Sequence, residues 1–526
     1  MARIVVLVFW ATVALAQTGA QLLVLCRDEF VPAVQPLVDW RNSTGLRTKL
    51  VKFSEVSTDT AMVHAYLMNA WQFWQPRPEY VLIVADPGYF RSKIYGYGSD
   101  RYYSDHYYGD LSGDWHAEIP VGRFPAKTLE QCQTMVQKTL SYERAPEPGD
   151  SLWMRRLTTV IREDYDADDS VYWNDIRIAA QAAGAAGFVG CDSLSLARGN
   201  TKADVLSCIG RGAGMVMYRG RATANWYTPF DVDPGLTTNT TELPLILSFT
   251  CETMALDPFD SMVGEAWVKA RSVNGPTGGV AFFGNTHSDV DVAKLRSAIC
   301  RGFVTGLFTE RRYRLGLAAL RAKAQLASEY PDSICKDDYR GFNILGDPAL
   351  SIWTATPRSL TMQHPTQIDP GPHVLDIVVR SEGAPVANAT VCATKDSSVW
   401  VCDTTDASGA AQLLVNPPDT GRILLVATGR NLLPCEGTVI VGSVAVEEPV
   451  VRPAPQAVAV RPNPCGNWAD VSLVSPGLVR VYDAAGALVK TENLGTGTSR
   501  LDLSSIRPGV YYVCAGGERQ KLLVSR

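Results

Sequence analysis

The sequence lacks several features that mark whole classes of protein. Its 49 Lys and Arg stand against 54 Asp and Glu, and no basic run is interleaved with aromatics, so a nucleic-acid partner is not expected. Only 12 of the 526 residues are Cys, too few for a fold held mainly by disulfides. Beyond the N-terminus no apolar run reaches the length of a membrane span, and no repeat is visible. The composition that remains fits about three or four ordinary globular domains.

The N-terminus carries the clearest targeting signal. Arg3 precedes an apolar run that ends in Ala14-Leu15-Ala16, a small-x-small cleavage site, and this predicts a removed signal peptide over residues 1–20. A transmembrane anchor is the alternative, but the run is shorter than the ~20 residues that a spanning helix needs. Export permits disulfides, and Cys392 with Cys402 and Cys465 with Cys514 are the first pairs to test, although spacing does not determine connectivity.

Residues 21–355 alternate short apolar strands with helical segments, which is typical of an α/β architecture with largely parallel strands. We divide them into an N-terminal α/β subdomain, 21–150, and a second subdomain, 151–355. Strands are predicted at 21–26, 50–53, 80–85, 157–161, 214–218, 244–249 and 279–283. Helices are predicted at 31–41, 58–73, 129–143, 171–183, 262–270, 290–304 and 313–328.

After Trp353 the pattern changes to short β-rich runs separated by Gly, Pro and Asp turns. We predict a β-sandwich over residues 356–443. A linker containing Pro449, Pro453 and Pro455 covers 444–456, and a second small all-β domain covers 457–526.

Two polar segments follow predicted strands in the second subdomain. Gly220-Arg221 follows the strand 214–218, and Cys251 follows the strand 244–249. Because parallel strands end at one edge of a sheet, we expect both segments at one crevice, where open α/β sheets bind ligands. From spacing alone Cys251 is either a nucleophile or a buried structural thiol.

Several motifs in order resemble the gingipain family of secreted cysteine endopeptidases. They are Val38-Asp-Trp40 with Thr44-Gly45-Leu46, Pro78–Ile83, Ser99-Asp100 with Tyr107-Tyr108, Glu118–Arg123 and Phe342–Pro348. Together they span about residues 21–355. The resemblance implies a caspase-like catalytic region of two subdomains, an immunoglobulin-like module after it, and protein or peptide substrates.

The resemblance also implies roles at the two strand ends. In the family a Gly-His-Gly supplies the general base, and a cysteine ending the next strand is the nucleophile. Cys251 matches the nucleophile, whereas the base position reads Gly220-Arg221-Ala222. The carboxylate that orients the family's histidine falls at Glu118, and the backbone N–H groups of Gly220 and Cys251 would form the oxyanion hole.

Arg221 cannot replace a general base, because arginine does not titrate at neutral pH. A guanidinium can stabilise a thiolate or developing negative charge. It cannot protonate the departing amine, and losing acid/base assistance typically costs about 10² to 10⁴ in rate.

Histidine is scarce, and only one of the six is placed to restore the missing base. His287 follows the predicted strand 279–283, where it would form a dyad with Cys251; a loop histidine without a role is the alternative. The others are His64, His106, His116, His364 and His373.

Two acidic stretches raise the question of a metal. Asp100–Asp114 and Glu163–Asp169 are rich in carboxylates, and the resemblance to gingipains implies calcium binding. Neither stretch has the spacing of a loop that ends in a bidentate Glu, so solvated acidic turns are the alternative. No cofactor is expected for the chemistry itself.

The last 70 or so residues resemble a different family. Val460–Pro464, Val479–Gly486, Leu501–Leu503, Pro508–Tyr511 and the basic end 521–526 are similar to the type IX secretion sorting domain, a small β-sandwich. The resemblance implies export by outer-membrane secretion machinery, followed by release or attachment at the cell surface. A plain β-rich accessory domain is the alternative.

We therefore predict a secreted cysteine endopeptidase that acts through a Cys251 thiolate and a thioester acyl-enzyme. Arg221 takes the place of the family's histidine, and His287 is the candidate acid/base. The alternative is a catalytically inactive caspase-like scaffold used for binding or adhesion, which the change at position 221 favours.

Overall fold

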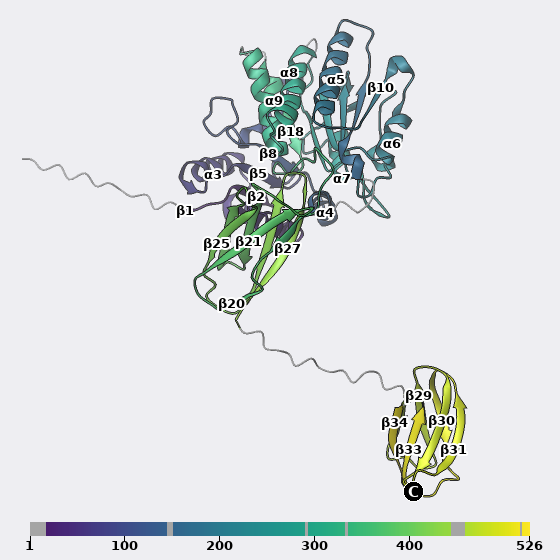
Figure 1. The fold of residues 1–526 in the computed structure, drawn as a ribbon. Coiled ribbons are helices and arrows are strands. Elements are labelled where there is room, and N and C mark those ends of the chain that lie inside the picture. The colour runs from purple at the N-terminus through teal and green to yellow at the C-terminus, as the bar shows by residue number, and fades with distance from the viewer. Residues whose placement is uncertain (1–16, 145–150, 290–292, 332–334, 443–457, 516–517) are drawn as a thin grey trace, which may run out of the picture. The chain divides into compact units, whose positions relative to one another are not determined.

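The computed structural model describes residues 17–144, 151–289, 293–331, 335–442, 458–515 and 518–526. The chain divides into two compact units between Gly442 and Ser443 (Figure 1). The expected linker 444–456 and the first 16 residues of the expected signal peptide lie outside the described residues. Within the first unit, β1 (Gln17–Thr18) pairs with β4 (Trp74–Gln75), so this unit begins earlier than the expected boundary at residue 20.

A ten-stranded sheet runs through the first unit in the order β10-β9-β11-β14-β17-β18-β8-β5-β2-β3 (Figure 1). The strands are β2 (Leu22–Cys26), β3 (Thr48–Lys52), β5 (Tyr80–Val84), β8 (Val121–Phe124), β9 (Arg156–Ile161), β10 (Gly190–Ser195), β11 (Met215–Arg219), β14 (Leu245–Glu252), β17 (Ala281–Asn285) and β18 (Phe342–Leu345). Only the β17–β18 pair within this sheet is antiparallel. The two predicted subdomains therefore share one sheet, joined where β18 pairs with β8.

Helices cover both faces of this sheet. One face packs against α1 (Val31–Ser43), α4 (Leu129–Arg144), α6 (Lys202–Gly210) and α7 (Val263–Lys269). The other face packs against α5 (Asp168–Ala185), α8 (Ala293–Val304), α9 (Leu315–Glu329) and α10 (Lys336–Gly341). At the β2 and β5 end, α3 (Thr60–Phe73) covers a smaller core.

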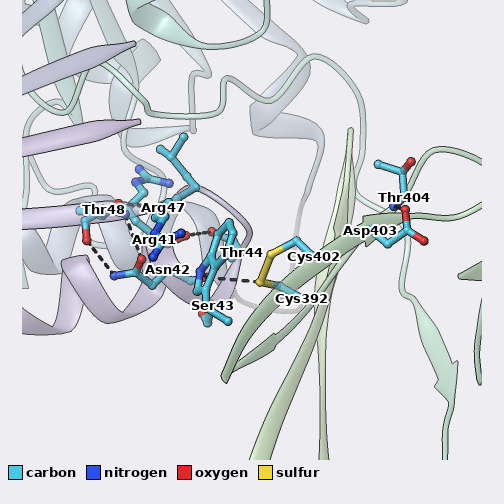
Figure 2. The surroundings of a disulfide bond; sticks show 12 residues. Arg41, Asn42, Ser43, Thr44, Arg47, Thr48, Cys392, Cys402, Asp403 and Thr404 are labelled. Carbon is cyan, nitrogen blue, oxygen red and sulfur yellow. Dashed lines mark hydrogen bonds between the residues drawn. A yellow bond between two sulfur atoms is a disulfide. The ribbon is translucent and has the colours of Figure 1, made fainter. Parts of the chain in front are cut away.

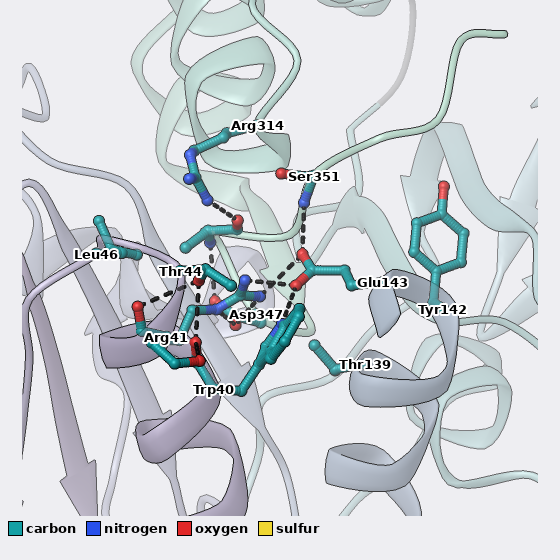
Figure 3. Close-up of polar contacts among 12 residues, drawn as sticks. Trp40, Arg41, Thr44, Leu46, Thr139, Tyr142, Glu143, Arg314, Asp347 and Ser351 are labelled. Atoms are coloured by element: carbon teal, nitrogen blue, oxygen red, sulfur yellow. Dashed lines mark hydrogen bonds and ion pairs between the residues drawn. The ribbon is translucent and has the colours of Figure 1, made fainter. Parts of the chain in front are cut away.

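A buried ion-pair cluster holds α1, α4 and the turn after β18 together (Figure 3). The guanidinium of Arg41 lies 2.5 Å from Glu143 Oε2 and 2.7 Å from Asp347 Oδ2. Trp40 Nε1 also donates to Glu143, at 2.9 Å. Trp40 and Asp347 belong to the first and last of the motifs that resemble gingipains, so these motifs meet at a structural joint.

A β-sandwich follows the α/β region within the first unit. One sheet contains β19 (Thr361–Gln363), β21 (His373–Ser381), β22 (Ala384–Pro385) and β25 (Ala410–Val415); the other contains β20 (Gln367–Ile368), β23 (Thr390–Lys395), β24 (Val399–Thr404), β26 (Gly421–Gly429) and β27 (Leu432–Val441). The side chains between the two sheets, such as Leu375, Val391 and Leu425, form one apolar core.

A disulfide joins the β23–β24 hairpin beside the end of α1 (Figure 2). It links Cys392 to Cys402, which confirms that expected pair. Trp400 of the same hairpin donates from Nε1 to the carbonyl of Asn42 at 3.0 Å, and this contact anchors the sandwich on α1. The other expected pair is wrong, because Cys465 and Cys514 are free thiols. Cys465 forms a backbone β-bridge with Val524 of β34, whereas Cys514 pairs with Arg519 in the β33–β34 ladder.

The second unit is a small β-sandwich, as the sequence predicted. Its sheets contain β28 (Val458–Arg461), β29 (Trp468–Leu473) and β32 (Gly497–Asp502), and β30 (Gly477–Asp483), β31 (Leu488–Leu494), β33 (Gly509–Ala515) and β34 (Glu518–Val524). Val471, Val481 and Val513 lie in its apolar core. Among the residues described in both units, no helix is long and apolar enough to cross a membrane.

Candidate active site

Cys251 lies near the carboxyl end of β14, next to the end of β11. Side chains alternate along a strand, and Leu247 and Phe249 face the core formed with α5 and α8. Cys251 continues that side of the strand. Its Sγ accepts a hydrogen bond from Nη1 of Arg296, a residue of α8, at 2.9 Å.

The two strand ends form the wall of one pocket of about 230 Å³. Cys251, Gly220, Arg221, Tyr227 and Arg296 all line it. The structure therefore brings together the two segments that sequence analysis placed at one crevice. The sulfur is only partly buried, which leaves it open to a ligand in this pocket.

Arg221 lines the pocket but pairs with carboxylates. Its Nε lies 3.2 Å from Asp164 Oδ2 and its Nη2 lies 2.7 Å from Asp166 Oδ2. Burial raises the pKa of Asp164, although the charges of Arg162 and Arg221 act in the opposite direction. No hydrogen bond joins Arg221 to Cys251 among the residues that the structure describes.

The backbone at Gly220 has a conformation that favours glycine. Its φ is +146°, and a Cβ there would lie 2.7 Å from the carbonyl oxygen of Arg162. The Thr250 hydroxyl donates to the Gly220 carbonyl and holds this turn against β14. The turn thus lies on the pocket wall, and the oxyanion role of the Gly220 and Cys251 N–H groups stays a prediction.

His287 packs against Tyr102. Its ring centroid lies 4.7 Å from that of Tyr102, and its buried Nδ1 has no hydrogen-bond partner among the described residues. Burial raises the pKa of Glu252, and the charge of His287 partly opposes this shift. Glu252 follows Cys251 directly in β14, so its side chain points to the opposite face of the sheet. The expected Cys251–His287 hydrogen bond is not present in the described part of the chain.

Glu118 organises a loop. Its carboxylate accepts hydrogen bonds from the backbone N–H groups of Leu111 at 2.6 Å and Ser112 at 3.1 Å. The carboxylates that do contact the base position are Asp164 and Asp166, which the sequence analysis had considered only as part of an acidic stretch.

Arg296 is the site residue that the sequence analysis missed. Its Nε lies 3.3 Å from Oδ1 of Asp338, which also accepts from Asn285 Nδ2 at 2.6 Å. Arg296 lies inside a helix rather than at a strand end, and it follows no motif that the sequence analysis used. Its position on the core-facing side of α8, where apolar residues are expected, was the available signal.

The acidic stretches use their oxygens within the protein. Asp105 binds the buried guanidinium of Arg123 at 2.6 Å. Asp169 accepts from the backbone N–H groups of Asp164 and Tyr165 at 2.8 and 2.9 Å. Within the described ranges, no three His, Cys, Asp or Glu residues are grouped so that they could hold a metal ion. The calcium binding that the resemblance implies therefore stays a prediction.

Two family models match parts of the chain. Residues 15–353 match the model of peptidase family C25, and residues 459–524 match the secretion system C-terminal sorting domain. The chain belongs to peptidase family C25. Its sorting domain indicates that this family member is secreted or held at the cell surface.

Relatives of this C25 member are distant but cover most of it. Gingipain R2 of Porphyromonas gingivalis is 22% identical over 498 residues, 90% of this chain and 64% of the relative. Gingipain R1 of the same species is 23% identical over 374 residues, 67% of this chain and 36% of the relative. The chain thus spans less than two thirds of either relative.

Solved structures confirm the predicted fold class. The crystal structure of the Arg-specific cysteine proteinase gingipain R superposes with a TM-score of 0.72 at 17% identity, and covers 81% of this chain and 98% of that one. A complex of the pro- and mature domains of P. gingivalis RgpB gives a TM-score of 0.71 at 18% identity, with 80% of this chain and 100% of that chain covered. The chain therefore has the gingipain fold and belongs to a family of cysteine peptidases.

Proposed function

We propose that this C25 member is a secreted cysteine endopeptidase in which Cys251 attacks the peptide carbonyl carbon. The new S–C bond gives a thioester, the C–N bond breaks, the amine leaves with a proton, and water then hydrolyses the thioester. The observation that supports this is a partly exposed thiol at the joint end of β11 and β14, on a pocket of about 230 Å³ with a guanidinium 2.9 Å from its sulfur.

Arg221 in the place of the family's histidine makes this a slow peptidase. Asp164 and Asp166 hold its guanidinium, and a guanidinium neither gains nor loses a proton at neutral pH. With no histidine on the sulfur among the described residues, water or a rearranged His287 supplies the proton for the leaving amine. Cleavage about 10² to 10⁴ below that of a histidine-assisted enzyme follows.

A catalytically inactive scaffold for binding or adhesion is the second candidate function. The ion pairs of Arg221 favour it, because they tie the base position to Asp164 and Asp166. In that case Cys251 would form no acyl-enzyme, and substitution of the thiol would alter no cleavage.

The deciding experiment measures hydrolysis of a diverse peptide library by the reduced, calcium-supplemented protein. Wild type is compared with Cys251→Ala, His287→Ala and Arg221→His, and with Cys191→Ala as a control at an exposed thiol elsewhere in the sheet. The proposed peptidase function is supported if Cys251→Ala abolishes cleavage, Cys191→Ala does not, and Arg221→His accelerates it. Loss with His287→Ala as well assigns the proton transfer to that residue.

Absence of cleavage would also decide between the two candidate functions. If folded wild-type protein and folded Arg221→His both leave the library intact from mildly acidic to mildly basic pH, the scaffold function holds. The assay is repeated without added calcium, which tests whether the stability of the protein or its cleavage of peptides depends on this ion.

A further inference from the structure

We propose that Arg296, oriented by Asp338, holds Cys251 as the thiolate and fixes the position of its sulfur. The inference rests on the proposed role of Cys251 as nucleophile. It can be tested separately, because the ionisation of a thiol is measurable without any peptidase activity.

The contact between the two side chains has the geometry of a charge-assisted hydrogen bond. Nη1 of Arg296 donates to Cys251 Sγ at 2.9 Å, and only 5% of Arg296 is exposed. A buried cation acts on its neighbour with little screening by water. The proton of the thiol passes to solvent through the open side of the pocket, and the sulfur keeps the electron pair.

Asp338 fixes the orientation of this guanidinium. It lies on α10, is 2% exposed, and binds Nε of Arg296 at 3.3 Å while Asn285 donates to the same oxygen at 2.6 Å. Burial by itself would lower the pKa of Arg296, but Asp338 and then Cys251 raise it above its ordinary value. The guanidinium is therefore charged. Among the described residues Nε binds Asp338, Nη2 donates to the carbonyl of Asp289 at 3.4 Å, and Nη1 donates to the sulfur.

Arg221 is the other arginine of the pocket, and it is less suited to this role. Two carboxylates already bind it, and its side chain is 50% exposed, so water and Asp164 and Asp166 offset its charge. The hydrogen bond to the sulfur comes from Arg296 of α8 and not from Arg221.

The test is the rate at which iodoacetamide alkylates Cys251 at pH 7 in the full chain. The thiolate forms an S–C bond, the C–I bond breaks and iodide leaves, so the rate reports the reactive thiolate. Mass spectrometry of the peptide that contains Cys251 follows the reaction, and the exposed Cys191 in the same sample is the internal reference.

Three substitutions distinguish how the charge of Arg296, the shape of its side chain and a general loss of stability affect the alkylation rate. Arg296→Gln should slow alkylation by about tenfold, the effect of losing one charge-assisted hydrogen bond. Arg296→Lys keeps the charge but loses the fork that binds Asp338 and the sulfur together, and should slow alkylation less than Arg296→Gln does. The matched control is Arg123→Gln, which breaks another buried Arg–Asp pair, at β8, and should leave the Cys251 rate unchanged.

Each outcome bears on the inference. Alkylation of Arg296→Gln at the wild-type rate overturns it, and so does equal slowing in Arg123→Gln, because a global change would then explain both. If Arg296→Gln does not fold, Arg296→Met with Asp338→Asn leaves no unpaired buried charge and should show the same slowing. If Arg296→Gln slows alkylation but the wild type cleaves no peptide, this inference holds and the proposed peptidase function fails. If the wild type cleaves peptides but Arg296→Gln is alkylated at the wild-type rate, the peptidase function holds and this inference fails.

Discussion

Arg41 and Arg296 are both buried arginines on helices that cover the large sheet, yet their partners differ. Arg41 is shared by two carboxylates, Glu143 and Asp347 (Figure 3). Among the residues that the structure describes, Arg296 pairs with one carboxylate, Asp338, and its Nη1 donates to the sulfur of Cys251. Two carboxylates make Arg41 a structural joint, whereas Nη1 of Arg296 is directed at the Cys251 sulfur. Stability and reactivity can therefore be changed separately in this molecule.

Removing Arg41, which binds two carboxylates, should have the largest effect on stability. Arg41→Met leaves Glu143 and Asp347 buried without a cation, and we expect the free energy of unfolding to fall by about 3–5 kcal/mol. Denaturant unfolding of the full chain measures this loss. Adding Glu143→Gln and Asp347→Asn should recover most of it, and Cys251 should be alkylated at the wild-type rate. A loss below about 1 kcal/mol would contradict the structural role of this cluster.

Lys323 extends the comparison to a buried cation with no acid partner among the described residues. It lies against the ring of Tyr339, and burial lowers its pKa to about 7 from 10.5. Because the unfolded chain holds this proton more tightly than the folded protein, stability should rise with pH between about 7 and 10.5. The penalty is complete below that window and absent above it.

Lys323→Met should remove this penalty. We expect the variant to be more stable than wild type by on the order of 3 kcal/mol at pH 6, and by little above pH 10.5. Thermal unfolding at several pH values measures the difference. An advantage that is equal at pH 6 and pH 10 would show that packing, rather than ionisation, causes it.

The Cys392–Cys402 disulfide lies beside the end of α1 that contains Arg41. Asn42, the residue after Arg41, accepts from Trp400 beside the Cys392–Cys402 bond (Figure 2). Replacing both cysteines by Ala should lower the free energy of unfolding by about 2–3 kcal/mol, as expected for a short closed loop. Reduction of the wild type should give a similar loss. No change in either experiment would leave the charge cluster as the main anchor of this helix end.

The sequence predicted elements with a clear apolar pattern and missed those built around buried polar residues. β11, β14 and α4 match predicted segments closely, since each buries a regular apolar face. β8 and β18 were missed because they are four residues long and contain buried Arg123 and Asn343. β10 was missed because it is a polar strand at the edge of the sheet.

The site could be predicted only where a strand end carries the residue. Cys251 and Arg221 follow apolar strands, so their shared pocket could be inferred from topology. The partners of each side chain could not, because they depend on the direction in which a side chain leaves the backbone. His287 and Glu118 follow the expected pattern in sequence, yet the structure gives them Tyr102 and the backbone of Leu111 as neighbours.

Replacing the thiol itself should have the smallest effect on stability. Cys251→Ala removes a partly exposed sulfur, and Arg296 keeps its ion pair with Asp338, so no buried charge loses its only partner. We expect the free energy of unfolding to change by less than about 1 kcal/mol, as for substitutions outside a packed core. Denaturant unfolding beside Arg41→Met measures it. A loss as large as that of Arg41→Met would mean that the Cys251–Arg296 contact is a structural joint too, and the contrast between the two arginines would fail.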